Sequence, residues 1–299
     1  MPPRDATKPF VWSGIALSIP THWETGYLGM GYAVLEAAFR PVLEVKTAVI
    51  RGRFSFKRHM KQLARSGRPT GGLSLTAMRL PPDWSCFPAA VEVEAFRWQG
   101  AAIGGQGLLH YCRTCRRATL MQFYTYPDAG GGSAAAPSVL ASFRDHGLDA
   151  GPTLAVYDIA ATLPDRLLLT HFHFAAGRFE LVFSRPRGEQ VTLWRLSPAK
   201  TLLERRQHDM AMIVRDSTLL PPEAYPASGR ANGAATEWQW RRDGLARRMQ
   251  AFLNRHAPPS DCALRIWQPP RSNCLLAVRA ERLRRYDQFE KICADYGLI

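Results

Sequence analysis

One order of predicted elements occurs twice along this chain, and it limits the fold more than any single motif does. Ile15–Pro20 predicts a short strand stopped by proline, and Asp158–Pro164 repeats that pattern in the second half. In both halves, further strands, a helix opened at a serine, a loop, a Trp-bearing strand, a hairpin and a closing helix follow. The offset between the two series is roughly 142 to 150 residues.

The matching positions are few, but they keep the same order. They are Ser55 and Ser197 at helix starts, Glu94–Gln99 and Glu237–Arg241 as strands, and Gly147-Leu148 and Gly297-Leu298 after the closing helices. We therefore predict an α+β protein of two tandem pseudo-repeated units, each a mostly antiparallel sheet covered by helices. The first unit is expected to span 1–149 and the second 150–299, with the first ten residues as a loose tail. The alternative is two unrelated α+β domains.

The second half contains a basic segment that the first half lacks. Gly244–His256 is predicted as an inserted amphipathic helix, with Leu245, Met249, Phe252 and Leu253 on its apolar stripe. Arginines beside it could contact phosphates or an acidic protein surface, and the alternative is an ordinary surface helix with a solvated face. The candidate arginines are Arg241, Arg242, Arg247 and Arg248, with Arg284 and Arg285 near the C-terminus.

Composition and charge narrow the class of protein. The chain has 299 residues, of which 46% are hydrophobic and 21% charged, so it can bury a core and global disorder is excluded. The net charge of +14 is spread evenly over both halves and suggests nucleic acid, an anionic membrane or an acidic protein as partner. The first residues lack the apolar core of a signal peptide, no stretch predicts a membrane span, and the cysteines have no regular spacing. We expect a cytoplasmic protein with free thiols.

The order of elements resembles a known superfamily. A short strand ending in proline with an aromatic residue soon after, as in Ile15–Trp23, is similar to the PsbP-like α/β/α sandwich, and Ile159–Pro164 repeats the strand without the aromatic residue. The resemblance could cover most of each half. It implies a binding module, adaptor or chaperone, and it supplies no catalytic residues.

Cys112-Arg113-Thr114-Cys115 forms a CxxC motif on a predicted hairpin. Two thiolates at a tight turn can face one metal ion, and a closed zinc site would need two more ligands, for which Cys262 and Cys274 are candidates. Alternatively, the flanking arginines would lower the thiol pKa and favour a redox role. The third interpretation is that the motif is structural or incidental.

His171 and His173 stand two apart on a predicted strand and therefore share one face. Two imidazoles on one face can bind a metal ion, and His110 could add a third through the fold. The alternative is a pair of polar residues on a solvent-facing side, with Phe172 and Phe174 on the core side.

No motif predicts catalysis. The chain lacks GxSxG, SxxK, a Walker A loop and GxGxxG after a strand, and Gly104-Gly105-Gln106-Gly107 is predicted as a loop. We therefore expect no catalytic residue and no cofactor other than zinc at Cys112 and Cys115. The leading hypothesis is a non-enzymatic binding or adaptor protein that engages a protein partner through its sheets or interdomain groove. The alternatives are a nucleic-acid-associated protein using the arginines and a metal-binding or redox protein using 112–115.

Overall fold

The structure is a computed structural model that divides into two compact units, Met1–Asp158 (unit 1) and Ile159–Ile299 (unit 2). It describes all residues except 1–5, 67–73, 85–86, 89, 101, 129, 147–152, 165–166, 187, 207–208, 221–229, 233–234, 242–260 and 284–285, and it describes the backbone alone at 66, 130, 230–232, 241, 261 and 283. The boundary lies after Asp158 rather than after residue 149, because Leu154–Val156 (β11) pairs with Thr7–Trp12 (β1). The expected N-terminal tail is wrong for the same reason, since residues 7–10 belong to β1.

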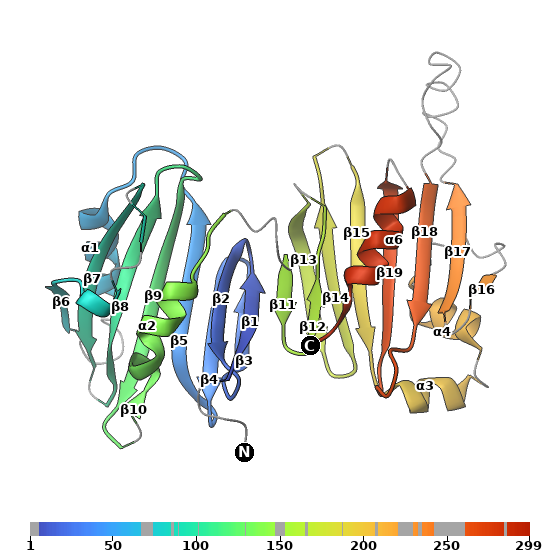
Figure 1. Ribbon diagram of the computed structural model, residues 1–299, viewed down its shortest axis with the longest axis horizontal. Coiled ribbons are helices and arrows are strands. Elements are labelled where there is room, and N and C mark those ends of the chain that lie inside the picture. Colours follow the sequence, from blue (N-terminus) through green and yellow to red (C-terminus); the bar gives the residue numbers. More distant parts are fainter. Residues whose placement is uncertain are drawn as a thin grey trace, which may run out of the picture. The chain divides into compact units, whose positions relative to one another are not determined.

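Unit 1 is built around an antiparallel sheet with the strand order β3-β4-β5-β9-β8-β7-β6 (Figure 1). Its strands are β3 (Glu24–Gly29), β4 (Tyr32–Ala37), β5 (Arg40–Val49), β6 (Ser74–Met78), β7 (Val91–Gln99), β8 (Gly104–Cys112) and β9 (Arg117–Tyr126). The short β10 (Gly130–Gly131) pairs with β9, and β1 forms a hairpin with β2 (Ile15–Pro20).

Two helices lie on opposite faces of this sheet. Leu109 lies beneath α1 (Phe56–Ser66), whereas the neighbouring His110 contacts Phe143, which directly follows α2 (Ala136–Ser142). Neighbouring residues of a strand point to opposite faces, so α1 and α2 cover different sides. The 3-10 turns Pro82–Trp84 and Gly132–Ala135 complete the described elements of unit 1.

Unit 2 contains a second antiparallel sheet, with the strand order β13-β14-β15-β19-β18-β17-β16 (Figure 1). Its strands are β13 (Leu168–Ala175), β14 (Arg178–Ser184), β15 (Gln190–Leu196), β16 (Arg230–Asn232), β17 (Ala235–Arg241), β18 (Asp261–Trp267) and β19 (Leu275–Leu283). The helices are α3 (Ala199–Arg205), α4 (Met210–Asp216) and α6 (Tyr286–Asp295), and β12 (Ile159–Ala161) pairs with β20 (Gly297–Leu298).

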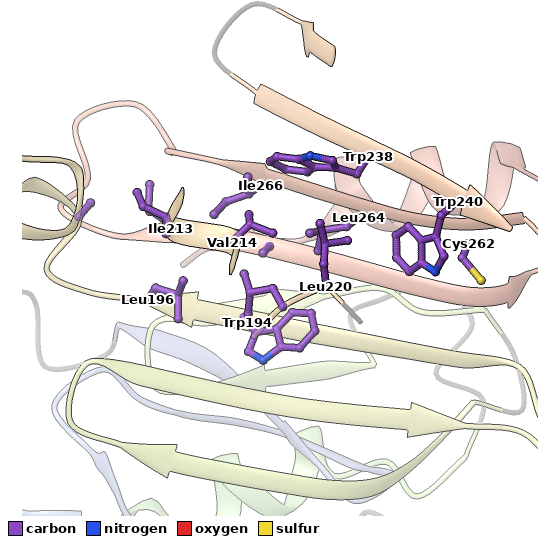
Figure 2. Close-up of a cluster of buried hydrophobic side chains, with 14 residues drawn as sticks. Trp194, Leu196, Ile213, Val214, Leu220, Trp238, Trp240, Cys262, Leu264 and Ile266 are labelled. Atoms are coloured by element: carbon purple, nitrogen blue, oxygen red, sulfur yellow. The ribbon is translucent and has the colours of Figure 1, made fainter. Parts of the chain in front are cut away.

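The core of unit 2 gathers tryptophans and aliphatic side chains on one face of its sheet (Figure 2). Trp194 and Trp238 are each 2% exposed, and half-buried Leu202, Leu203 and Met210 from α3 and α4 pack against the same cluster. The other face meets α6, where the Arg265 guanidinium lies 5.5 Å from the centre of the Phe289 ring. Helices therefore cover part of each face of this sheet.

The two sheets share one strand order, and particular residues occupy corresponding places in it. Leu35 lies opposite Leu43 in unit 1 as Leu181 lies opposite Leu193 in unit 2, and all four are fully buried. The α+β class with antiparallel sheets is therefore confirmed. Duplication of one ancestral unit stays a prediction.

Tight turns give a further correspondence between the units. Gly31 and Gly177 have φ angles of 67° and 82°, in the region that favours glycine. Their carbonyls accept hydrogen bonds from the backbone N–H groups of Thr47 and Ser197, at 2.7 and 2.8 Å. A Cβ atom at either glycine would meet the carbonyl oxygen of that same partner, so both turns require glycine.

One expected correspondence between the two units is wrong, and two predicted segments lie outside the described residues. Ala16 pairs with Arg144 and Ala160 pairs with Gly297, so Arg144 rather than Gly147 corresponds to Gly297. Gly147 and Leu148 lie outside the described residues, as does the predicted basic helix at 244–256.

The loop predicted at Gly104-Gly105-Gln106-Gly107 is wrong, because these residues begin β8. Trp98 and Phe96 of β7 lie directly opposite Gly105 and Gly107. A Cβ atom at Gly105 would lie 2.8 Å from the Trp98 Nε1, and one at Gly107 would lie 2.6 Å from the Phe96 ring. The glycines therefore leave room for two buried rings.

A group of charged side chains connects α6 to the sheet of unit 2. The Arg265 guanidinium binds Glu237 of β17 and Glu290 of α6, each with an N–O distance of 2.6 Å. The Tyr286 hydroxyl also donates to Glu237. Burial alone would raise the pKa of Glu237, but hydrogen bonds from Tyr286, Gln239 and Arg265 outweigh it and hold the pKa below its ordinary value of 4.5.

We expect the stability of unit 2 to fall as the pH decreases below about 4.5. Glu237 has a lower pKa in the folded than in the unfolded state. The unfolded state therefore binds more protons in this range, and lowering the pH stabilises it relative to the folded state. Urea midpoints of unit 2 between pH 6 and pH 3 measure the effect. Glu237→Gln should flatten that pH dependence, and an unchanged slope in the variant would contradict the assignment.

Candidate functional site

The connection between β8 and β9 carries the two cysteines of the CxxC motif. Cys112 is the last residue of β8 and is fully buried, whereas Cys115 lies in the turn and is half-buried. Arg116 closes the turn with a φ angle of 57° and leads into β9. The predicted hairpin is confirmed, and it places both sulfur atoms at one end of the sheet.

The segment after α2 brings two more ligand-type side chains to the same place. Pro137 lies in the first turn of α2, and the backbone becomes extended at Phe143. Arg144 then pairs with Ala16 through two backbone hydrogen bonds of 2.8 and 2.9 Å. This pairing fixes the next two residues, of which Asp145 is 8% exposed and His146 is exposed.

Cys112, Cys115, Asp145 and His146, which we call the four-residue cluster, offer ligand atoms that all lie within 4.8 Å of one another. The Cys112 Sγ is 3.8 Å from the His146 Nδ1, and the Cys115 thiol donates to the Asp145 Oδ2 at 3.2 Å. The Asp145 Oδ1 lies 2.6 Å from the His146 Nδ1. Two segments thus converge on one small volume with two sulfurs, one imidazole nitrogen and one carboxylate.

The pKa of Cys115 is shifted in the direction opposite to the one that the redox interpretation expected. Burial and the hydrogen bond to Asp145 raise it to about 12, although a backbone hydrogen bond from Arg117 opposes them. The guanidinium groups of the flanking arginines have other partners: Arg113 pairs with Glu92, while Arg116 donates to the Gly52 carbonyl and Arg117 to the Ser13 carbonyl. Cys115 therefore lacks the lowered pKa that the redox interpretation expected.

His110 lies near the cluster but outside the group of mutually close ligand atoms. It precedes Cys112 by two residues on the same face of β8 and is 1% exposed, between the rings of Phe87 and Phe143. Burial lowers its pKa, with Asp145 opposing, so the ring is neutral. Its Nδ1 has no hydrogen-bond partner within the described part of the chain.

The other predicted site residues lie apart from this cluster. His171 and His173 are exposed on one face of β13, opposite Phe172 and Phe174, as expected. Among the residues that the structure describes, no third metal-binding side chain joins these histidines. Buried Cys262 and Cys274, the candidates for the two further ligands, belong to unit 2 and are not part of the four-residue cluster.

The candidate arginine site falls almost entirely outside the described residues. Arg242, Arg247, Arg248, Arg284 and Arg285 lie outside the described residues, and Arg241 is described only through its backbone in β17. The nucleic-acid role that rests on them stays a prediction, and so does the engagement of a protein partner. None of the helices within the described residues is long and apolar enough to cross a bilayer.

Comparisons with known proteins give only distant likenesses. No family model and no curated protein matches the chain. A crystal structure from Bacteroides thetaiotaomicron VPI-5482 has a TM-score of 0.31 and 13% identity, covering 72% of this chain and 71% of the other. The apo structure of the immunity protein TplEi of the T6SS from Pseudomonas aeruginosa has a TM-score of 0.36 and 10% identity, covering 98% and 97%.

Proposed function

We propose that unit 1 binds a zinc ion through the four-residue cluster. The observation that supports the proposal is the convergence of Cys112, Cys115, Asp145 and His146, whose ligand atoms lie within 4.8 Å of one another. Two thiolates, one imidazole and one carboxylate are ligands that zinc accepts in a tetrahedral site.

The spacing suits a zinc ion. Bond lengths of about 2.3 Å to sulfur and about 2.0 Å to nitrogen or oxygen separate tetrahedral ligands by roughly 3.3–3.8 Å. The distances of 3.8 Å between Cys112 and His146 and 3.2 Å between Cys115 and Asp145 are close to those values. The 2.6 Å contact between the Asp145 Oδ1 and the His146 Nδ1 is shorter and would have to lengthen on binding. Binding would displace the thiol proton that Cys115 now donates to Asp145, and the metal would take the place of that proton.

The proposed role of the ion is structural. Four protein ligands leave no open position for a substrate or an activated water, as a catalytic zinc requires. The ion would cross-link the β8–β9 turn to the segment after α2. Because Arg144 is paired with Ala16 of β2, that segment is already attached to the β1–β2 hairpin. Zinc would then hold three parts of unit 1 together.

Metal analysis of the purified, zinc-reconstituted protein tests the proposal. We expect about one equivalent of zinc, bound more weakly at acidic pH because the thiols must lose their protons. Zinc at about 100 times its dissociation constant should stabilise unit 1 by about 2.7 kcal/mol, and chelation should reverse this. Cobalt substitution gives an independent optical readout of thiolate ligation.

Matched variants separate the cluster from other thiols and imidazoles. Cys115→Ser and His146→Ala should each abolish stoichiometric binding, whereas Cys274→Ser and His171→Ala should retain it. Cys274 is a buried thiol of unit 2, and His171 is an exposed histidine outside the cluster. Less than about a tenth of an equivalent after reconstitution, or unchanged binding in both ligand variants, would overturn the proposal.

A further inference from the structure

An open pocket lies between α1 and the sheet of unit 1, on the face opposite the four-residue cluster. Its volume is about 390 Å³, within the size range of small-molecule sites. Apolar side chains from the helix and from three strands dominate its lining, namely Met60, Leu63, Ala48, Leu109, Ala118 and Leu120. An apolar occupant would therefore be removed from water on several sides.

The helix above the pocket is held at its beginning by stacked rings. Phe54 lies between His59 and Tyr111, with ring centroids 4.7 and 4.3 Å away and interplanar angles of 26° and 10°. This stack fixes the start of α1 beside β8. Met60 and Leu63, one turn further on, remain only half-buried and face the pocket. The helix thus presents an apolar stripe that the protein's own side chains leave partly uncovered.

The surface around this pocket is strongly cationic. Between Glu44 and Asp83 the sequence has nine Lys and Arg residues and no Asp or Glu. The residues Lys57, Arg58, Lys61 and Arg65 of α1 are all exposed. No ion pair to these four occurs among the described residues, although Lys46 at the pocket pairs with Glu44. An anionic group at the pocket mouth would meet unneutralised positive charge.

Several side chains of α1 could donate hydrogen bonds to a ligand in the pocket. Gln62 lines the pocket, and Arg58 and Arg65 lie four residues before and three after it, on the same side of the helix. His59 also lines the pocket, and its Nδ1 is 2.8 Å from the Ser55 carbonyl oxygen. A carbonyl only accepts, so the Nδ1 donates to it and the Nε2 is the other polar atom of the ring.

We propose that this pocket binds a single-chain anionic amphiphile, with the apolar chain beneath α1 and the anionic head at Arg58 and Arg65. The apolar lining favours a hydrocarbon chain in the ligand, and the unpaired positive charge of α1 favours a negatively charged head group. A single-stranded nucleic acid fits less well, because both faces of the Phe54 ring are already covered and offer no stacking platform.

Calorimetric titration of the full chain with decanoate, dodecanoate and dodecyltrimethylammonium, each below its micelle concentration, tests the proposal. Two additional methylenes should tighten binding about 15-fold from decanoate to dodecanoate, since each buried methylene contributes about fourfold. The cationic dodecyl ligand should bind at least about tenfold more weakly than dodecanoate, and the difference should shrink at high salt.

Two variants test the pocket without touching the buried core. Ala48→Leu adds volume at an exposed lining position of β5 and should weaken dodecanoate about tenfold. Arg58→Gln with Arg65→Gln should weaken dodecanoate but leave the cationic ligand unchanged or tighter. Lys200→Gln, at an exposed lysine of α3, is the control and should change nothing.

Several results would overturn the proposal. They are equal affinity for decanoate and dodecanoate, equal affinity for the two head charges, or dodecanoate binding that survives Ala48→Leu unchanged. Binding of a single-stranded oligonucleotide that competes with dodecanoate and depends on Arg58 would instead favour a nucleic-acid ligand. Binding to anionic vesicles without binding of monomeric dodecanoate would favour a membrane surface.

Discussion

Replacing Leu193 with alanine is expected to lower the free energy of unfolding of unit 2 by about 3 kcal/mol. Leu193 is fully buried at the centre of the sheet, directly opposite Leu181 of β14 and Val278 of β19. The substitution removes three buried carbon atoms and leaves a cavity that strands on both sides prevent from closing. Leu43→Ala in unit 1, between Leu35 and Phe123, should cost a similar amount.

Hydrogen exchange measured peptide by peptide distinguishes the two units in one experiment. Leu193→Ala should accelerate exchange in the strands of unit 2 more than in those of unit 1, and Leu43→Ala should do the reverse. Leu168→Ala is the matched control, because Leu168 lies on β13 and is 64% exposed. A loss below about 1 kcal/mol for either central leucine would contradict the assigned core.

Gly105→Ala is expected to destabilise unit 1 by about 3 kcal/mol, at the upper end of the usual cost of overpacking. The added Cβ atom would lie 2.1 Å from the carbonyl oxygen of Phe123 in the adjacent strand and 2.8 Å from the Trp98 Nε1. Neither group can withdraw easily, since Phe123 belongs to the central β9 and Trp98 is 3% exposed. The tryptophan ring, the strand or both must shift.

Gly104→Ala is the matched control one residue earlier. Its Cβ atom would first meet the Gln99 Oε1 at 2.4 Å, which is the end of a side chain that can rotate away, and then the Trp98 carbonyl oxygen at 3.2 Å. We expect a cost of about 1 kcal/mol or less. Urea denaturation followed by tryptophan fluorescence measures both. Equal losses in the two variants would show that the ring of Trp98 does not set the requirement for glycine.

The sequence predicted those strands that their own residues indicate, and missed those that depend on distant parts of the chain. Ile15–Pro20 reads as a strand because apolar residues alternate and a proline ends it, and β2 has these bounds. The pattern missed β1, where Pro9 interrupts the signal and the pairing with β11 comes from a distant part of the chain. It also missed the start of β8, because glycine favours loops unless a neighbouring ring needs the space.

The candidate site was half predictable. The spacing of Cys112 and Cys115 places two sulfurs at a turn, and the hairpin follows from the flanking strands. Asp145 and His146 carry no such signal, because about 30 residues and a helix separate them from the motif. Their position depends on the pairing of Arg144 with Ala16, which sequence spacing does not encode.

The strand order has a consequence for synthesis of the protein. β5 pairs with β9, and the partner of Val49 is Arg117, about 70 residues later in the chain. The edge of β5 that pairs with β9 therefore stays uncovered until those residues have been synthesised. At about 5–20 residues per second, the wait on the ribosome lasts roughly 3–14 seconds. The edge of β15 stays uncovered slightly longer, because Leu196 pairs with Leu275, about 80 residues later. The nascent chain therefore twice exposes an unpaired strand edge, which makes it a substrate for chaperones and a risk for aggregation during translation.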